Sequence, residues 1–500
     1  MSASSPPSQL LPPLPTKLTD LDVDSLSHCL ARLSVRDVSA LAMTCTSLKR
    51  LSYSDTVWLR FFREHWHLQE PCSSLNSSGA RDLYLARRTA LLQFRFLDPS
   101  VLSFYRPRTN FSHLLLHKNQ IISAQGSTVE MIDLNNNVTG GATHLFSGHR
   151  ARITCMRLFP SRGETEREQN FLVTSSYDHS IRLWGKKGSF SRCMRGHNGP
   201  VLSLSDKLLG DDTCKVFASG GEDGTVRLWS LSSSGKQGQQ PLKATLYGHE
   251  KPVDLVLVTG HKTSLLVTIS RDAKVRVWDT TTSSSARSSC CVGMTALRGA
   301  PVNMKCHESL LYVAAGSSVT AIDLRTMQKV ITAAVHQPKL YSFDIVPSKS
   351  LICTGGDGRA LLWDIRRNQE ASNPDPVAEL DGHIGRVTLL HMDPYKVVTG
   401  GPDDDYVNVW DSDTGVQANS LFSCSDKEVV HKFGCEAMAV DGFRIATATS
   451  CDETSILHYR DFKDAVHPVA KPENDPPSKF WSSLSGDYCD DDTRDLGSSW

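Results

Sequence analysis

Most of the chain consists of short apolar runs that alternate with polar residues and end in turn-forming residues. In one such stretch, Phe217-Ala218-Ser219 is a short apolar run, Gly220 to Gly224 supply turn residues, and Thr225 to Trp229 alternate again. Alternation with a period of two is typical of β-strands, and glycine clusters mark the turns between them. No helical periodicity is seen between residues 145 and 460. The pattern predicts a long region of short antiparallel strands.

One arrangement recurs along this β-rich region: an aspartate followed six positions later by a tryptophan that ends an apolar run. Such a recurrence at a period in the forties indicates stacked copies of one small structural unit. The pairs are Asp178/Trp184, Asp223/Trp229, Asp272/Trp278, Asp357/Trp363 and Asp404/Trp410. A histidine precedes each pair, in a Gly-His dipeptide in four of the five copies. These histidines are His149, His197, His249, His336 (without the glycine) and His383.

These residues resemble the WD40 family, whose repeats carry Gly-His early and Trp-Asp late. The resemblance implies a mainly β fold, a β-propeller of four-stranded antiparallel blades. It also implies a network of four side chains in each blade, in which a hydroxyl accepts from the buried indole N–H and a histidine–aspartate pair completes the chain. The expected members are His149, Thr174, Asp178 and Trp184; His197, Ser219, Asp223 and Trp229; His249, Thr268, Asp272 and Trp278; and Asp357, Trp363 and Trp410 in later copies.

Three weaker copies extend the array. Residues 111–134 and 300–325 keep the strand pattern but carry Ile132-Asp133 and Ile322-Asp323 in place of Trp-Asp, and residues 434–461 carry Tyr459 at the tryptophan position. Counting these copies gives eight units, with the tryptophan-equivalent positions 41 to 52 residues apart. We therefore predict an eight-bladed propeller over residues 101–465. Seven blades is the alternative, if the first or last copy is an unclosed pair of strands.

The first hundred residues follow a different pattern. Residues 1–17 are rich in serine and proline, lack the features of a signal peptide, and are predicted to be a disordered lead. From Leu21 to Trp66 apolar residues recur at three- and four-residue steps, which predicts three short amphipathic helices. Ser34 to Asp37 has the pattern of a capping box, and a third helix is expected after Ser54. Helices this short bury little surface alone, so we expect a partner.

Residues 18–66 resemble the F-box. The resemblance implies docking on a Skp-type adaptor, which hangs from a cullin that carries the ubiquitin-transfer machinery. This chain departs from the family pattern at Asp22 and Ser34, where prolines are usual, and at Leu48, where a tryptophan is usual. The expected adaptor contacts are Leu21, Leu26, Leu30, Leu33, Val38, Leu41, Cys45, Leu51 and Trp58. The helical pattern alone also fits a helical cap packed on the propeller. Residues 67–100 are expected to be a linker with a connecting helix at 81–96.

Composition excludes several classes of function. The chain has 54 Lys and Arg against 54 Asp and Glu, so no overall field favours nucleic acid or an acidic membrane. No apolar run approaches the length of a membrane span. The 14 cysteines are scattered, which suits a reducing compartment, and we expect a soluble protein of the cytoplasm and/or nucleus. The segment 466–500 is expected to be a disordered acidic tail.

Candidate chemistry is sparse. Cys424, His431 and Cys435 lie close together in the sequence, but a fourth ligand is missing for a tetrahedral zinc site. We find no nucleophile–base arrangement and no phosphate-binding glycine loop followed by a helix. We therefore expect no metal, no cofactor and no catalytic activity.

The loops of the expected propeller carry basic residues that suit a protein target. These loops follow Gly-His or join the two middle strands of each blade, and they meet at one face. Convergent arginines would suit a phosphorylated or acidic peptide, because the guanidinium group pairs bidentately with phosphate. The alternative is ordinary solvated loop charge. The expected target contacts are Arg150, Arg152, Tyr177, Lys251, Arg271, Lys339 and Arg386.

Together the two resemblances imply a non-catalytic substrate receptor of an SCF-type ubiquitin ligase, with transfer driven by proximity. The partners would be a Skp-type adaptor, through it a cullin, and an unidentified protein target. Two alternatives remain. Trp363-Asp364-Ile365-Arg366 matches the Trp-Asp-x-Arg end of receptors that dock on the damage-binding adaptor of another cullin. A protein-interaction scaffold unrelated to ubiquitin is the other.

Overall fold

The computed structural model divides the chain into two compact units, Met1–Ala90 and Leu91–Trp500. Leu21, Cys424 and His431, and the predicted lead and tail, lie outside the described residues. The described residues are 23–30, 32–65, 79–82, 84, 85, 89, 93–96, 98–134, 143–161, 169–185, 190–210, 215–231, 241–260, 262–282, 290–367, 374–412, 414–423, 434–450 and 454–465.

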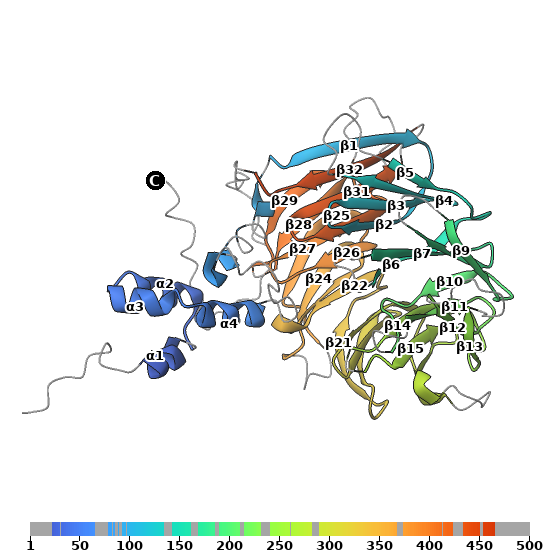
Figure 1. Cartoon of the computed structure of the whole chain (residues 1–500), viewed down its shortest axis with the longest axis horizontal. Coiled ribbons are helices and arrows are strands. Elements are labelled where there is room, and N and C mark those ends of the chain that lie inside the picture. The colour runs from blue at the N-terminus through green and yellow to red at the C-terminus, as the bar shows by residue number, and fades with distance from the viewer. Residues whose placement is uncertain are drawn as a thin grey trace, which may run out of the picture. The chain divides into compact units, whose positions relative to one another are not determined.

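The first unit is helical, with α1 (Val23–Leu30), α2 (Val35–Ala42), α3 (Thr46–Ser52) and α4 (Asp55–His65) (Figure 1). The predicted capping box is confirmed: Ser34 N–H donates to Asp37 Oδ2 and Asp37 N–H donates to Ser34 Oγ, both at 3.2 Å. The three predicted helices are wrong in number, because two helices, not one, lie between the capping box and Ser54. Cys45 is extended and its sulfur accepts from Leu48 N–H at 3.5 Å, so it caps a new helix, α3.

The core of this unit includes a segment beyond the four helices. Ala80 and Tyr84 are almost completely buried together with Trp58 and Phe61. Ala80 N–H donates to Asp55 Oδ1 at 2.8 Å, and the Tyr84 and Trp58 rings lie 5.3 Å apart. The predicted connecting helix at 81–96 is therefore wrong in extent. Its described residues up to 89 are helical, but η2 (Gln93–Arg95) is a 3-10 turn that belongs to the second unit.

The second unit is a propeller of eight four-stranded antiparallel sheets (Figure 1). We number the blades 1 to 8 along the chain. Blades 1 to 4 contain β2 (Phe111–His117), β3 (Gln120–Gln125), β4 (Thr128–Asp133) and β5 (Thr143–Phe146); β6 (Ile153–Ser161), β7 (Gln169–Ser176), β8 (Ser180–Trp184) and β9 (Phe190–Arg195); β10 (Val201–Leu204), β11 (Val216–Gly221), β12 (Val226–Ser230) and β13 (Leu242–Leu246); and β14 (Val253–Val258), β15 (Leu265–Ser270), β16 (Lys274–Asp279) and β17 (Cys291–Ala296).

The second half of the ring repeats this order, inner strand first. Blades 5 to 7 contain β18 (Pro301–His307), β19 (Leu310–Ala315), β20 (Ser318–Asp323) and β21 (Lys329–Val335); β22 (Ser342–Val346), β23 (Leu351–Gly355), β24 (Asp357–Asp364) and β25 (Ala378–Arg386); and β26 (Leu389–Met392), β27 (Lys396–Gly400), β28 (Tyr406–Asp411) and β29 (Gln417–Phe422). Blade 8 contains β30 (Ala437–Asp441), β31 (Arg444–Ser450), β32 (Thr454–Asp461) and β1 (Ser100–Pro107). Short 3-10 turns, η4 (Thr280–Thr282) and η5 (Pro347–Lys349), follow β16 and β22.

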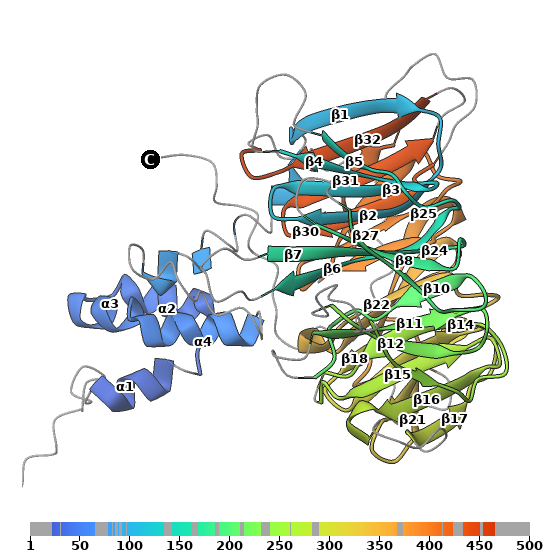
Figure 2. The same cartoon turned by 45° about the vertical axis from the view of Figure 1, so that its right-hand side comes forward.

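The ring closes through β1, the first strand of the unit. β1 pairs antiparallel with β32 along its whole length, from Ser100 opposite Asp461 to Pro107 opposite Thr454 (Figure 2). The last blade therefore takes its outer strand from the other end of the unit, which leaves no unclosed pair of strands. The prediction of eight blades is confirmed. The three weaker copies are complete blades, with Ile132, Ile322 and Tyr459 on the third strand of each.

Apolar packing joins each blade to its neighbour. One buried cluster combines Phe159 and Val173 of blade 2 with Phe217 and Trp229 of blade 3. Because the clusters cross between blades, burial of apolar surface stabilises the ring as a whole. The alternating up-and-down strands define two faces. The upper face carries the loops after Gly-His and the turns between second and third strands, and the lower face carries the other turns.

Candidate functional site

Below the upper face, four blades contain the predicted side-chain network. In blade 2, Trp184 Nε1–H donates to Thr174 Oγ1 at 2.8 Å, His149 Nε2 lies 2.8 Å from the same hydroxyl, and His149 Nδ1 lies 2.9 Å from Asp178. With the proton on Nδ1, every polar group in this chain has a partner. Blades 3, 4 and 7 repeat the geometry with His197, Ser219, Asp223 and Trp229; His249, Thr268, Asp272 and Trp278; and His383, Thr399, Asp404 and Trp410.

The network of blade 6 differs from the prediction. Trp363 Nε1–H donates to Thr354 Oγ1 at 2.8 Å, and His336 Nδ1 lies 3.0 Å from that hydroxyl. Asp357, however, is exposed at the start of β24 and has no hydrogen bond to His336, so its assignment to the network is wrong. The threonine and tryptophan are nine residues apart here, against ten in blades 2 to 4. The shorter turn places Asp357 on the strand.

Sequence reasoning missed two hydroxyls of this set, Thr354 and Thr399. Both are fully buried and both accept the indole N–H of their blade. The signal that would have found them is a serine or threonine nine to eleven residues before each tryptophan.

The network also holds the loops of the upper face. The carboxylate of Asp178 accepts from Arg150 N–H at 2.9 Å, and that of Asp404 accepts from the N–H groups of Ile384 and Gly385 at 2.7 and 3.0 Å. Each aspartate therefore fastens the first residues after Gly-His. A side chain at the glycine of that dipeptide would be crowded: a Cβ at Gly196 would lie 2.6 Å from Arg227 Nη1, so the end of the arginine side chain would have to move.

Protonation states follow from this burial. Burial lowers the pKa of His149, opposed by its hydrogen bond to Asp178, so the imidazole is neutral near pH 7. Burial alone would raise the pKa of Asp178, but hydrogen bonds from Ser180, from Arg150 N–H and from His149 outweigh it and lower this pKa to about 2. Repetition of this arrangement in blades 2, 3, 4 and 7 indicates a structural role, in which ionised aspartates anchor the loops above them.

On one side of the upper face, Arg152 packs against the ring of Tyr177. The guanidinium of Arg152 lies 4.2 Å from the centre of the Tyr177 ring and donates to its hydroxyl at 2.7 Å. Arg271 Nε–H donates to both oxygens of Asp254, at 2.9 and 3.1 Å. The hydrogen bond between Arg271 and Asp254 is the main cause of the raised pKa of Arg271, and the nearby Tyr177 and Glu222 raise this pKa further. These five side chains form what we call the Tyr177 cluster, in which two carboxylates balance two arginines.

On another part of the upper face, Lys339 and Arg386 lie against Tyr341. Their charged groups are 5.2 and 5.7 Å from the centre of the Tyr341 ring. Arg386 also faces Asp403 at 3.9 Å, with more than half of each side chain exposed. We call these four residues the Tyr341 cluster. Within this cluster, the carboxylate of Asp403 faces Arg386, and no carboxylate of the cluster contacts the ammonium group of Lys339.

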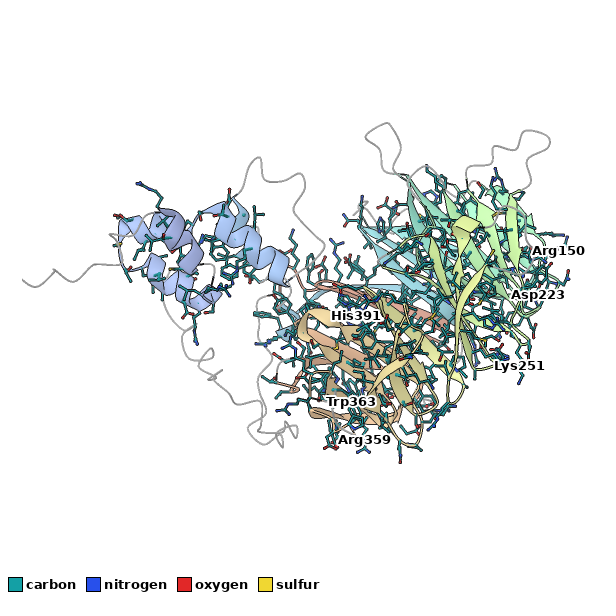
Figure 3. All side chains as sticks on the ribbon, turned by 90° about the horizontal axis from the view of Figure 1, so that it is seen from below. Arg150, Asp223, Lys251, Arg359, Trp363 and His391 are labelled. Atoms are coloured by element: carbon teal, nitrogen blue, oxygen red, sulfur yellow. The ribbon has the colours of Figure 1, made fainter. Side chains whose placement is uncertain are left out.

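The remaining predicted contacts stand apart. Arg150 and Lys251 are exposed on loops of blades 2 and 4, on either side of the blade that carries Asp223 (Figure 3). Among the described residues the seven predicted contacts thus fall into two tyrosine-centred clusters and two separate cations. A central cavity of about 460 Å³ is lined by inner strands that include β22 and β26, with Tyr341 and His391 among its residues.

In the helical unit, four of the eight described residues among the predicted adaptor contacts are buried. Leu30, Val38 and Trp58 are at most 2% exposed and pack on one another, so their assignment as contact residues is wrong: they hold the unit together. Leu26 is buried as well. The half-buried residues are Leu33, Leu41 and Leu51, and Cys45 is exposed. Two apolar side chains that the prediction omitted are exposed, Met43 (84%) and Tyr53 (42%).

No group of three potential metal ligands occurs in the part of the chain that the structure describes. Cys435 is completely buried and its Sγ–H donates to Ala437 O at 3.2 Å. Burial raises the pKa of this thiol to about 12. No helix among the described residues has the length and apolarity needed to cross a membrane.

Family models match both parts of the chain. The F-box domain model matches residues 18–60, and the WD domain, G-beta repeat model matches residues 140–185, 188–230, 240–279 and 327–364. The chain is therefore an F-box/WD40-repeat protein. Matches to blades 2, 3, 4 and 6 agree with the fold, whereas the third strands of blades 1, 5, 7 and 8 lie outside the residues matched by the repeat model.

Several known proteins are similar to part of this chain. The chain is 27% identical to a ribosome biogenesis protein WDR12 homolog of Oryza sativa subsp. japonica, over 52% of this chain and 64% of the relative. It is 23% identical to ribosome biogenesis protein YTM1 of Meyerozyma guilliermondii, over 58% and 68%. The crystal structure of a computationally designed protein, Ika8, superposes with a TM-score of 0.54 at 19% identity, covering 73% of this chain and 98% of the design. The latter likeness concerns the fold alone.

Proposed function

We propose that this protein is the non-catalytic substrate receptor of an SCF-type ubiquitin ligase. The observation that carries the proposal is an F-box domain and a complete propeller in one chain. The F-box unit would dock on a Skp-type adaptor and through it on a cullin. The propeller would hold the target protein, and proximity would then bring about ubiquitin transfer.

The helical unit supports adaptor docking through a surface narrower than the sequence suggests. Because Leu30, Val38 and Trp58 fill its core, the apolar side chains left exposed for a partner include Met43 and Tyr53. Exposed apolar side chains in a small domain favour association with another protein.

Capture of a purified Skp-type adaptor by the full-length chain tests this function. Met43→Asp is expected to weaken capture at least about tenfold, since an acidic group must then be buried in an apolar contact. The matched control is Thr56→Asp, at an exposed position in the first turn of α4, where an acidic residue suits the helix. Failure of the unaltered chain to capture the adaptor would contradict the proposal. Capture of a damage-binding adaptor by the propeller instead would support the ligase alternative based on Trp363 to Arg366.

The upper face is the proposed site of target binding. The network anchors its loops, and the Tyr177 and Tyr341 clusters present aromatic rings beside cations. Phosphate dependence can be measured by fluorescence anisotropy with matched phosphorylated and plain peptides. If phosphate is recognised, Arg152→Glu with Arg386→Glu abolishes the preference. Equal affinities of the two peptides would exclude phosphate recognition.

A second candidate is an assembly scaffold without a link to ubiquitin. It is favoured by the relatives named as ribosome biogenesis proteins, which match 52% and 58% of this chain. Affinity purification of the full chain and of a chain lacking residues 1–66 separates the two functions. A receptor loses adaptor and cullin on deletion, whereas a scaffold keeps the same set of partners.

A further inference from the structure

Two basic side chains on neighbouring inner strands of the propeller lack polar partners. Arg157 lies on β6 of blade 2 and His113 on β2 of blade 1, and these two strands contact each other. Both residues are half-buried, and the Nε atom of Arg157 and the Nδ1 atom of His113 are shielded from water. Neither side chain forms a hydrogen bond or an ion pair with any residue that the structure describes. Such partnerless buried groups are rare in folded proteins and need an explanation.

This lack of partners distinguishes Arg157 from other arginines of the propeller. Among the described residues, three more arginines have a buried Nε atom without a hydrogen bond: Arg182, Arg276 and Arg444. Each of these, however, places its guanidinium group near an aromatic ring, a sulfur atom or a carboxylate. The guanidinium group of Arg157 therefore stands apart in having no such neighbour among the described side chains.

Elsewhere on the inner strands, opposite charges compensate each other. Lys305 Nζ of blade 5 lies 3.2 Å from Asp344 Oδ1 of blade 6, and Asp254 of blade 4 accepts from Arg271 at 2.9 Å. A half-buried guanidinium group without a counterion costs free energy, because it has lost part of its water and gained no ion pair. An anion bound beside Arg157 would offset this cost.

The two side chains together have the chemistry of an oxyanion site. A guanidinium group offers parallel N–H donors to two oxygens of a phosphate or a carboxylate, and an imidazole N–H can donate to a further oxygen. Burial, and then the charge of Arg157, lower the pKa of His113 to about 4, so its imidazole is neutral near pH 7 and carries one N–H. The central cavity of about 460 Å³ borders the same strand directly after His113, at Leu114, Leu115 and Leu116, and has room for a small molecule.

We propose that Arg157 and His113 form a binding site for a small oxyanion, a molecule bearing a phosphate or a carboxylate group, between the inner strands of blades 1 and 2. The site belongs to the propeller alone and does not depend on the proposed receptor function. The bound anion bridges the inner strands of two blades. Because the unfolded chain cannot form this site, binding stabilises the folded ring by mass action.

Isothermal titration calorimetry of the full-length chain with inorganic phosphate and with malonate tests the site. Ionic strength is held constant, because salt screens the weak attraction of anions to exposed charges. At least one of the two anions should bind with a stoichiometry near one and a Kd below about 1 mM. Binding of phosphate alone would identify a phosphate group as the ligand chemistry, and binding of malonate alone a carboxylate. Binding of both would show a site for either group.

Arg157→Gln should weaken this binding at least about tenfold, because it removes the charge and the paired donors. His113→Leu should weaken it by a smaller factor, about threefold, since it removes one neutral donor. Arg195→Gln is the matched control. It removes the same charge from an exposed position on β9, the outer strand of blade 2, and should leave the Kd within about twofold of that of the unaltered chain.

Thermal midpoints without added anion give a second measurement, which separates a binding role from a structural one. Replacement of an arginine that holds the fold together lowers the midpoint, whereas removal of an unpaired half-buried charge should leave it unchanged or raise it. Four outcomes overturn the proposal: no binding of either anion to the unaltered chain, unchanged binding to Arg157→Gln, an equal loss of binding in Arg195→Gln, or an anion-free midpoint of Arg157→Gln lowered by more than about 2 °C.

Discussion

Replacement of Thr399 by valine tests whether the hydroxyl at the centre of each network stabilises its blade. Valine keeps the branched shape of threonine and removes its hydroxyl. Trp410 Nε1–H then loses its acceptor at 2.7 Å, and His383 Nε2 loses a partner at 2.7 Å. Both groups are nearly inaccessible to water, since Trp410 is 2% and His383 8% exposed. An unsatisfied buried polar group costs about 1–3 kcal/mol, so the variant should lose about 2–5 kcal/mol.

The measurement is urea-induced unfolding at neutral pH, with Thr388→Val as the control. Thr388 is exposed at the start of the same blade, so its replacement should change the free energy of unfolding by less than about 0.5 kcal/mol. Adding Trp410→Phe to Thr399→Val removes the indole N–H that Thr399→Val leaves without an acceptor. The double variant should therefore lose less free energy of unfolding than the sum of the losses of the two single variants. A loss for Thr399→Val as small as that of the control would refute the claim that the network stabilises the propeller.

Three further predictions concern the aspartates of the blades, the loss of stability at acidic pH, and the core of the helical unit. Asp404→Asn should lower the urea midpoint by the equivalent of about 1–3 kcal/mol because it weakens three hydrogen bonds. Asp357→Asn should leave the midpoint unchanged. Equal effects of the two variants would contradict the finding that Asp404 belongs to its blade's network and Asp357 does not. Burial lowers the pKa of His336 from 6.5 to about 4, so the unfolded chain binds more protons than the folded chain between these pH values. The free energy of unfolding should therefore fall by up to about 3 kcal/mol as the pH drops from about 6.5 to 4. His336→Gln should reduce this pH dependence, measured as urea midpoints across that range. Further acidification from about 4 to 2 should remove the contribution of Asp178, whose pKa falls from 3.8 to about 2. Leu30→Asp should unfold the helical unit, seen as lost helical circular dichroism, whereas Met43→Asp should keep it folded; a folded Leu30→Asp variant would show that Leu30 is not a core residue.

The repeat architecture was predictable from sequence because a blade is a local unit. Gly-His, hydroxyl and Trp-Asp lie within one repeat, so their spacing reports one recurring geometry. The pairing of β1 with β32 could not be found in this way. Val101 to Pro107 has no repeat signature, and its partner strand lies some 350 residues further along the chain. Closure follows from the need to cover the edge of β32, which is a property of the whole ring.

Asp357 shows where a spacing argument fails. Its distance to Trp363 equals that of the other four pairs, but the distance that matters runs from the hydroxyl to the tryptophan across the turn. Loss of one residue there moves Asp357 from the turn onto β24, where its carboxylate is exposed. His336 consequently reaches Thr354 through Nδ1, whereas the other histidines use Nε2. The same sequence pattern therefore corresponds to two hydrogen-bond arrangements.

The helical unit shows a second limit, because amphipathic periodicity marks an apolar face without saying what covers it. Leu30 and Trp58 have the pattern expected of contact residues, yet Tyr84, from outside the predicted module, packs against Trp58 and helps to seal it. A short domain that recruits a later segment to complete its core leaves its exposed side chains, such as Met43, and its half-buried leucines for a partner. Contact with the proposed adaptor would then depend on side chains that contribute little to folding. Variants at the exposed positions can therefore separate binding from stability, and variants at the leucines cannot.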